Sequence, residues 1–405
     1  MFAVACFKHS MFVGFRFALG EEHSVILKQD GSVWSTDVML PGFSQYFVKL
    51  IPSGAIAVAA GTGFSIALMQ FGGVYAMGRN SKGQLGDGTR IRKGTFSFVQ
   101  RIPFAKAVAT GYIHSMLLTQ KGSLWATGGN KYGQLGDGGA TQYRSKFFPV
   151  IFDGVMAVAA GGIHSIVLKE DGSVWAVGRN NNGQLGDDTK DDKNNFVKVI
   201  SGGAAHVAAG GHHSMVVKQD GSVWATGYNT HGELGDGSTT DRIHYVLVIS
   251  SRAKTVAAGR HHSMMLKEDG SVWATGYNLY GQLGDGSTND SWDFVQVISE
   301  GAKVIAAGAF HSMLFALDSS IWATGSNIEG QFGDGSTTSE KKFRILTPFA
   351  NGSRHHRCTC IFMIQSYVHL PHDFLRVYPS FHLIDYTRVS IHFLFAIDHH
   401  NTFNR

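Results

Sequence analysis

The sequence predicts an all-β protein, a seven-bladed β-propeller with four-stranded antiparallel blades. Three observations lead to this fold class. The pair His-Ser returns at intervals of 50, 49, 49 and 49 residues between His114 and His311. Each copy contains short runs of alternating apolar and polar residues separated by glycine-rich turns, and its strand motifs occur seven times. A fixed period of this length with strand-type alternation is typical of a propeller, whereas a helical solenoid needs apolar spacings of three and four.

One copy, residues 196–239, shows the expected strands in order. They are residues 196–200, 207–210, 213–218 and 223–227. The last two are joined by Asp220-Gly221, a pair favoured in two-residue β-hairpin turns because both positions need positive φ. A glycine-rich segment, residues 229–237, is then expected to carry the chain to the next blade.

Counting strands predicts how the ring closes. The strand that opens this copy recurs seven times, at Phe47, Phe98, Phe147, Phe196, Tyr245, Phe294 and Phe343. The first blade then lacks its own opening strand, and the last opening strand, residues 343–346, has no blade after it. We therefore expect residues 343–346 to pair with the first blade and close the ring, which also protects strand edges.

The repeat resembles that of the regulator-of-chromosome-condensation family. The motifs V-A-A-G-x-x-H-S, L-x-x-D-G-x-V-W and N-x-x-G-Q-L-G recur in this order between residues 17 and 349. The resemblance implies a seven-bladed propeller, in agreement with the strand count. It also implies varied roles, which include nucleotide exchange on the small GTPase Ran, light reception and scaffolding. Two copies depart from the pattern. The first lacks N-x-x-G-Q-L-G, and the second has Phe64, Phe71 and Tyr75 in place of His, Asp and Trp.

The recurring tryptophans are interpreted as structural. They are Trp34, Trp125, Trp175, Trp224, Trp273 and Trp322, with Tyr75 at the seventh place. The resemblance offers an alternative, since the family's ultraviolet-B photoreceptor uses stacked tryptophans. Those follow the A-A-G segment, where this chain has pairs such as Gly211-His212 and Arg260-His261.

The recurring histidines are also interpreted as structural. They are His23, His114, His164, His213, His262 and His311. Adjacent residues in a strand point to opposite faces, so His213 and Ser214 are badly placed for a hydrolase pair. We expect these rings to bind neighbouring backbone groups instead. Copies spaced around a ring cannot share one metal, whose ligands lie about 2.0–2.3 Å away.

The loop G-Q-L-G-D-G resembles a phosphate cradle but lacks the lysine and the following helix that such a cradle needs. We expect a structural turn whose aspartate accepts local backbone hydrogen bonds. The alternative is a ring of acids on one face that a basic partner could use. The residues concerned are Asp87, Asp137, Asp187, Asp236, Asp285 and Asp334.

Composition limits the remaining possibilities. The chain has 405 residues, a net charge of +5 without blocks of like charge, and three cysteines outside the repeats. Neither a nucleic-acid ligand nor a disulfide framework is indicated. We expect a monomer in the cytoplasm, with the nucleus as the alternative, no membrane segment, and no cofactor or metal. Two sets of residues are nevertheless candidate metal ligands. The pairs His212-His213 and His261-His262 alone make weak sites. Cys358 and Cys360 with His355 and His356 are the better candidate but lack the second half of a zinc motif.

The predicted organisation is an N-terminal extension (1–16), the propeller (17–349) and an unassigned tail (350–405). Two interpretations of the tail stay open: an added element that packs on the ring, or sequence not selected to fold. For function we predict a non-enzymatic scaffold whose propeller-face loops bind a protein partner. The alternative is a guanine-nucleotide exchange factor for a Ran-like small GTPase, which would use the most variable segments, residues 89–94, 189–195 and 240–244.

Overall fold

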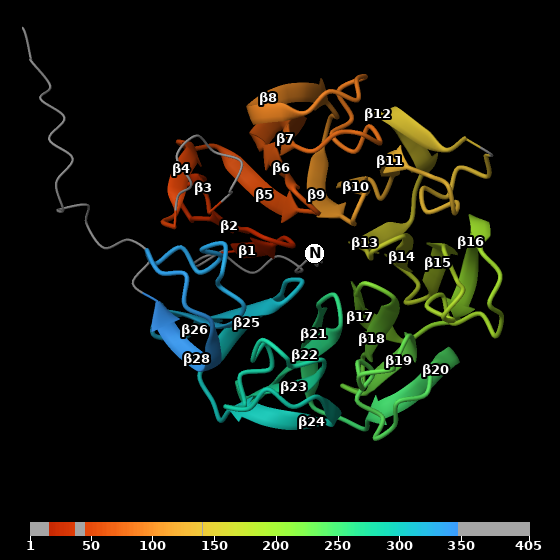
Figure 1. Cartoon of the computed structure of the whole chain (residues 1–405). Coiled ribbons are helices and arrows are strands. Elements are labelled where there is room, and N and C mark those ends of the chain that lie inside the picture. Colours follow the sequence, from red (N-terminus) through yellow and green to blue (C-terminus); the bar gives the residue numbers. More distant parts are fainter. Residues whose placement is uncertain (1–15, 37–44, 140, 347–405) are drawn as a thin grey trace, which may run out of the picture. The chain divides into compact units, whose positions relative to one another are not determined.

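The computed structural model describes residues 16–36, 45–139 and 141–346. In these residues the chain forms seven antiparallel four-stranded sheets and one short 3-10 turn, η1 (Gln70–Gly72). The sheets stand around a central axis as the blades of a propeller (Figure 1). The predicted all-β, seven-bladed architecture is therefore confirmed. The predictions for residues 1–15 and 347–405, including Cys358 and Cys360, lie outside the described residues.

Each blade consists of four consecutive strands, numbered from the centre of the ring to its rim (Figure 1). Blade 1 contains β1 (Arg16–Leu19), β2 (Ser24–Leu27), β3 (Val33–Ser35) and β4 (Val48–Ile51), and blade 2 contains β5 (Ala55–Ala60), β6 (Phe64–Met69), β7 (Gly73–Gly78) and β8 (Lys93–Arg101). Blade 3 contains β9 (Ala105–Thr110), β10 (His114–Thr119), β11 (Leu124–Gly129) and β12 (Tyr143–Ile151), and blade 4 contains β13 (Val155–Ala160), β14 (His164–Lys169), β15 (Val174–Gly178) and β16 (Lys193–Ile200). Blade 5 contains β17 (Ala204–Ala209), β18 (His213–Lys218), β19 (Val223–Gly227) and β20 (Arg242–Ile249). Blade 6 contains β21 (Ala253–Ala258), β22 (His262–Lys267), β23 (Val272–Gly276) and β24 (Ser291–Ile298), and blade 7 contains β25 (Ala302–Ala307), β26 (His311–Ala316), β27 (Ile321–Gly325) and β28 (Glu340–Leu346).

The last strand does not close the ring in the way that the strand count predicts. β28 pairs with β27 of its own blade, with Ile345 opposite Trp322, and blade 1 has its own outer strand, β4. The prediction that residues 343–346 pair with the first blade was wrong. The Phe-type strand is the outer strand of its own blade, so the glycine-rich segment does not lead to the next blade.

The glycine-rich loop explains the error, because it folds back on itself. In blade 5 the Asn229 side chain accepts a hydrogen bond from Leu234 N and donates to Asp236 Oδ1 and to the carbonyl of Thr240. These bonds turn the chain through a compact loop and return it antiparallel to the strand it has just left. A tandem repeat has no marked first strand, so its period alone could not show this.

The ring closes through the same contacts that join consecutive blades. The glycine-rich loops contact the outer strand of the following blade through isolated β-bridges, such as Asp87↔Lys146 and Asp285↔Lys342. The bridge Tyr46↔Asp334 repeats this contact between blade 7 and blade 1. Gly335 N also donates to Gln45 O at 2.9 Å. Blades 7 and 1 therefore join by the same side-to-side contact as the other blades, and no strand of one blade has to enter the sheet of the other.

A buried His–Ser pair crosses most of the blade interfaces. His114 Nε2 lies 2.9 Å from Ser165 Oγ, and Ser165 Oγ donates to the carbonyl of Gln134 at 2.8 Å. Because the hydroxyl hydrogen is used on the carbonyl, the imidazole Nε2–H must be the donor to the serine. The six pairs are His23–Ser65, His114–Ser165, His164–Ser214, His213–Ser263, His262–Ser312 and His311–Ser24. The last pair joins residues 287 positions apart and closes the ring.

The hydrogen-bond partner of each of these histidines differs from the one that the sequence predicted. His213 bonds to Ser263 of the next blade and not to the adjacent Ser214, and its partner is a hydroxyl where a backbone group was expected. The second copy shows what happens without the histidine. There Phe64 is fully buried, while Ser115 still donates to the carbonyl of Gln84 at 2.7 Å. Apolar packing therefore fills that interface.

The recurring tryptophans are half-buried on the third strand of six blades, and Tyr75 takes this place in blade 2. In five blades the indole Nε1 donates to the serine two residues earlier, as in Trp224 to Ser222 at 3.0 Å. In four of those five, a lysine ammonium also lies over the ring. The tryptophans therefore hold the hairpin that joins the second and third strands.

The buried histidines make the free energy of unfolding depend on pH. Burial lowers the pKa of His114, His164, His262 and His311 to about 3, from an ordinary 6.5. Below pH 6.5 the unfolded chain binds protons that the folded chain cannot, so stability falls as the pH falls toward 3. Each such histidine contributes up to about 1.4 kcal/mol per pH unit. Urea unfolding at several pH values between 7.5 and 4.5 should show this steep decline.

The matched control is His164→Phe, which copies the natural arrangement at Phe64. It removes one titrating group, so the free energy of unfolding should fall less steeply as the pH falls. The difference should equal the contribution of one buried histidine. A stability that stays constant between pH 6.5 and 4.5 in the unsubstituted chain would contradict the interpretation.

Candidate interaction face

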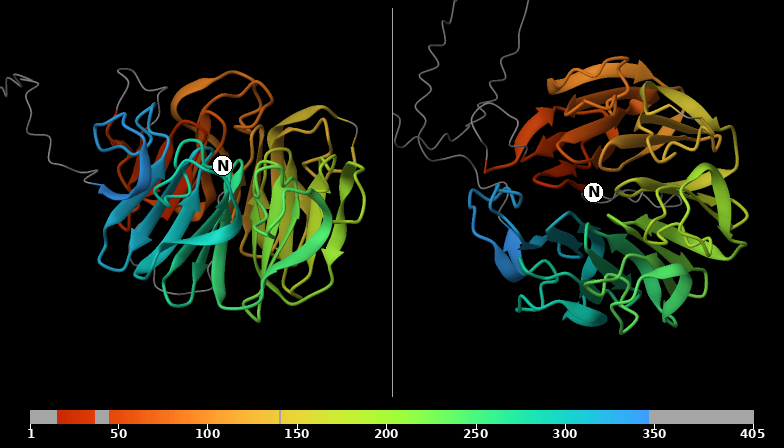
Figure 2. Two further views of the ribbon diagram at one scale, coloured as in Figure 1. Left: turned by 60° about the horizontal axis from the view of Figure 1, so that its bottom comes forward. Right: turned by 45° about the vertical axis from the view of Figure 1, so that its right-hand side comes forward.

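Two sets of loops emerge on the same face of the ring. Strands alternate in direction within a blade, so the connection from first to second strand and the connection from third to outer strand lie at one end. We call this end the loop face. The hairpins between second and third strands and the links between blades lie at the opposite end, the hairpin face. Figure 2 shows the strands running between the two ends.

The loop face is where the copies differ most in chemistry. Directly after the third strand the chain has Arg79, Arg179, Tyr228, Tyr277 and Ser326 at equivalent positions. The two residues inside the N-x-x-G motif also change, from Lys131-Tyr132 in blade 3 to Thr230-His231 in blade 5 and Leu279-Tyr280 in blade 6. The face is therefore basic over blades 2 and 3, with Arg179 of blade 4 beside them, and aromatic over blades 5 to 7. In the rest of the blade 4 loop the exposed Asp188, Asp191 and Asp192 offset the lysines.

The aromatic half contains a continuous set of ring contacts, which we call the aromatic cluster. Its members are Tyr228, His231, His261, Tyr277, Tyr280 and Phe310. The ring centroids of His231 and Tyr277 are 4.8 Å apart, and those of Tyr280 and Phe310 are 5.1 Å apart. Exposed apolar side chains stand nearby in the loops: Leu279 is 58 % exposed and Ile328 is 61 % exposed.

Two histidine–carboxylate pairs cross between blades 5 and 6 beside the cluster. His231 Nδ1 of blade 5 lies 2.8 Å from Asp290 Oδ2 of blade 6, and His261 Nδ1 of blade 6 lies 3.3 Å from Glu233 Oε1 of blade 5. Glu233 is fully buried and stands where five other copies have glutamine. A carboxylate in place of an amide at a buried position is stable only with a hydrogen-bonded partner, which His261 supplies.

The centre of the face is covered by side chains from distant blades. Tyr112 of blade 3 extends over two glycines, and a Cβ added at Gly211 would lie 2.7 Å from its hydroxyl. Arg260 of blade 6 lies 5.7 Å from the Tyr112 ring and donates to Glu21 Oε1 of blade 1 at 2.6 Å. Blades 1, 3 and 6 are thus joined across the axis.

Burial also determines the charge at this centre. It raises the pKa of Tyr112 to about 12. It lowers the pKa of His212 to about 4, with further contributions from His261, Arg179 and Arg260. Both rings are therefore neutral near pH 7, and the arginine and glutamate carry the charges at the centre.

The basic half combines cations with tyrosines. The Arg179 guanidinium lies 4.9 Å from the Tyr132 ring centroid, with Lys131 on the same ring at 5.2 Å. Arg90 lies 4.7 Å from the Tyr143 ring. Such contacts hold long cationic side chains in place while leaving their charge available to a ligand.

The six loop aspartates already form hydrogen bonds or ion pairs with other groups of the propeller. Asp137 Oδ1 accepts from Asn130 Nδ2 at 2.8 Å, and Asp137 Oδ2 pairs with Arg144 at 2.8 Å, leaving that side chain 3 % exposed. Asp87, Asp187, Asp236 and Asp334 likewise pair with Lys93, Lys193, Arg242 and Arg344. Asp285 accepts from Asn278 and Ser287. Their use by a basic partner stays a prediction, and it would require breaking these bonds.

Within residues 16–36, 45–139 and 141–346, no group of three or more His, Cys, Asp or Glu side chains is arranged to hold a metal ion. The same part of the chain contains no helix that is long and apolar enough to cross a membrane. The loop-face residues Tyr112, Tyr228, His231, Glu233 and Tyr277 were not among the predicted site residues. Their signal is present in the sequence, as departures from the repeat at aligned positions.

Recurring residues that build a closed ring, together with non-recurring residues that gather on one face, define this protein as a repeat propeller. The chain belongs to the RCC1-like domain family. The model of that domain matches residues 15–250, and the model of the regulator of chromosome condensation (RCC1) repeat matches residues 253–282. The resemblance seen in the sequence is therefore confirmed.

Solved structures share the fold. Human WBSCR16 has 23% identity and a TM-score of 0.68, with 75% of this chain and 84% of that chain covered. Prp20p from Saccharomyces cerevisiae has 22% identity and a TM-score of 0.62, with 72% of this chain and 80% of that chain covered. At these identities the likeness shows the fold alone. A search of curated protein sequences found no match.

Tyr112 offers a direct test of how the centre of the face is built. Its buried hydroxyl has no hydrogen-bond partner among the described protein groups, so Tyr112→Phe should change the free energy of unfolding by less than about 1 kcal/mol. Tyr112→Ala removes the ring that spans blades 3 to 6 and should cost about 2–4 kcal/mol. Urea unfolding of the two variants measures both values, and equal losses would contradict the assignment.

Proposed function

We propose that this chain is a non-enzymatic interaction module that presents its loop face to a protein partner. One observation supports this most. The loop residues that differ in chemistry from copy to copy lie on one face and divide it into a basic half and an aromatic half. The interior positions, by contrast, repeat with little change.

The aromatic half has the composition of an interaction site. Leu279 and Ile328 are more than half exposed, and Tyr280 is 37 % exposed beside them. Exposed apolar groups that gather in one region mark interaction surfaces more often than isolated ones do. Tyrosine and arginine are also enriched among the residues that carry most binding energy.

The basic half adds a requirement on the partner. Arg79, Lys82, Arg90 and Lys131 are exposed, while the loop aspartates of blades 2 and 3 are already paired. A partner with acidic residues opposite blades 2 and 3 would be guided to the face by charge, and an apolar segment opposite blades 6 and 7 would hold it.

The same geometry argues against hydrolase chemistry at the repeated motif. Each His–Ser pair is buried in a blade interface, and in four of the six pairs the serine hydroxyl that a nucleophile would need donates to a carbonyl. We also infer a reducing compartment from the three cysteines outside the repeats. We further propose that the protein is a monomer and works in the cytoplasm or the nucleus.

Substitutions on the two faces test the proposal. Leu279→Asp on the loop face should weaken capture of a specific protein from cell lysate at least about tenfold, since it places a charge in an apolar contact. The matched control is Phe152→Asp, because Phe152 is 78 % exposed in a link on the hairpin face. Quantitative mass spectrometry of the captured proteins measures the difference. Equal loss in both variants, or the absence of any protein that distinguishes them, would overturn the proposal.

A second candidate is nucleotide exchange on a Ran-like small GTPase. The observation that favours it is the fold shared with Prp20p, a protein studied for its binding to Gsp1p and histones. If this chain has that activity, micromolar amounts should accelerate release of a fluorescent GDP analogue from Ran, and Leu279→Asp should reduce the acceleration while Phe152→Asp does not. Release at the intrinsic rate would exclude it and leave the interaction module standing.

A further inference from the structure

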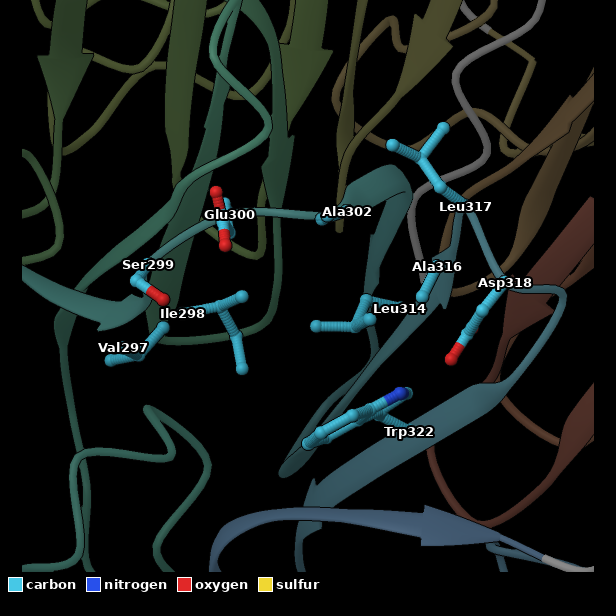
Figure 3. A pocket seen from close by; sticks show the side chains of 11 residues that line it. Val297, Ile298, Ser299, Glu300, Ala302, Leu314, Ala316, Leu317, Asp318 and Trp322 are labelled. Atoms are coloured by element: carbon cyan, nitrogen blue, oxygen red, sulfur yellow. The ribbon is translucent and has the colours of Figure 1, made fainter.

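A pocket of about 430 Å³ opens on the hairpin face between blades 6 and 7. Figure 3 shows Ile298 and Leu314 near the ring of Trp322, which forms one wall. The charged residues that line the pocket are Glu300, in the link between the blades, and Asp318, in the hairpin of blade 7. An indole face, aliphatic walls and two carboxylates thus surround one space.

The other blades show what normally occupies this place. A lysine six residues before the recurring tryptophan lays its ammonium over the indole ring in four blades. The distances from Nζ to the ring centroid are 4.2 Å for Lys28 and Trp34, 4.5 Å for Lys169 and Trp175, 4.0 Å for Lys218 and Trp224, and 4.0 Å for Lys267 and Trp273. A cation over an indole face is attracted by the negative potential of the ring.

Blade 7 keeps the receptor for that ammonium but not the ammonium itself. The equivalent residue is Ala316, and among the described residues no cation lies over Trp322. The rest of the arrangement is intact, because Trp322 Nε1 donates to Ser320 Oγ at 2.7 Å and Ser320 Oγ donates to Asp318 Oδ1 at 2.6 Å. Replacing a lysine by alanine removes the side chain that would cover the ring.

The carboxylates of the pocket suit a cation. Hydrogen bonds from the side chain and backbone of Ser320 lower the pKa of Asp318, so this carboxylate is ionised near pH 7. In blades 1, 4, 5 and 6 the covering lysine lies close enough to lower the pKa of the equivalent aspartate further. Asp318 lacks that neighbour, because Ala316 stands at the position of the lysine.

We propose that this blade 7 pocket binds the side chain of a lysine from another protein chain, in the place that an internal lysine occupies in four other blades. The ammonium lies over the face of Trp322 and near Glu300 and Asp318, while the methylene groups pack against Ile298 and Leu314. This site is on the face opposite the proposed partner-binding loops, so the two proposals can be tested independently.

The test uses the full chain and a minimal probe, Nα-acetyl-lysine methylamide. Indole N–H signals of the isotope-labelled protein are recorded by NMR, and Trp322→Phe identifies the signal of Trp322. Titration with the probe should shift that signal saturably in the millimolar range. The uncharged analogue Nα-acetyl-norleucine methylamide should bind about five- to tenfold more weakly, because it lacks the cation.

Two variants separate the cation site from simple apolar binding. Ala316→Lys restores the internal lysine and should weaken probe binding at least about tenfold by covering the ring. Glu300→Gln changes one exposed side chain, leaves the ring open, and should weaken binding several-fold. The reverse change in blade 6, Lys267→Ala, should make the Trp273 signal respond to the probe.

Three results would overturn the proposal. Equal affinity for the lysine and norleucine probes would show an apolar pocket, and no response of the Trp322 signal at tens of millimolar would show no site. Unchanged binding in Ala316→Lys, with the other indole signals in their native positions, would place the probe elsewhere. Should Ala316→Lys fail to fold, unchanged binding in Glu300→Gln together with no gain in Lys267→Ala would have the same force.

Discussion

The architecture depends on a hydrogen-bonded arrangement that recurs at the blade interfaces. An imidazole N–H donates to a serine at six of them, and at four the serine in turn donates to a carbonyl of the previous blade's loop. Full burial keeps the imidazole neutral, and its neutrality leaves a single arrangement of donors, as at His114, Ser165 and Gln134. A His–Ser pair of the same kind, His311 with Ser24, links blade 7 to blade 1, so closing the ring needs no special strand. The position of the imidazole ring also requires a glycine three residues before the histidine, because a Cβ there would clash with the ring.

This frame accounts for the division between structural and variable positions. Residues inside the ring must satisfy neighbours on both sides, so a change at one of them needs a compensating change nearby. Glu233 shows this: a buried carboxylate replaces the usual amide, and His261 is placed to pair with it. Loop residues such as Leu279 and Ile328 face solvent and carry no such constraint, so they can differ from blade to blade and collect into surfaces with their own chemistry.

The repeat made the all-β class, the seven blades and the hairpins predictable, because strand alternation and Asp-Gly turns are local signals. The strand that ends each blade was assigned wrongly, since the fold-back of the glycine-rich loop depends on side-chain bonds such as those of Asn229. The partner of each histidine was also beyond prediction, because it lies about one period away and contacts arise only when the ring closes. For the same reason Tyr112, His212 and Arg260, widely separated in the sequence, gave no sign of meeting at the axis.

The most informative departures from a repeat are those that keep a receptor and lose its internal ligand. At Trp322 the indole, the bracing serine and the aspartate are all retained, yet the lysine that completes the arrangement elsewhere is an alanine. A position that had simply decayed would be expected to lose the brace as well, or to fill with a larger apolar side chain, as Phe64 fills the second interface. The open face of Trp322 between two carboxylates therefore differs in kind from the Phe64 substitution. One restores packing within the chain, and the other leaves an attractive site to be completed from outside it.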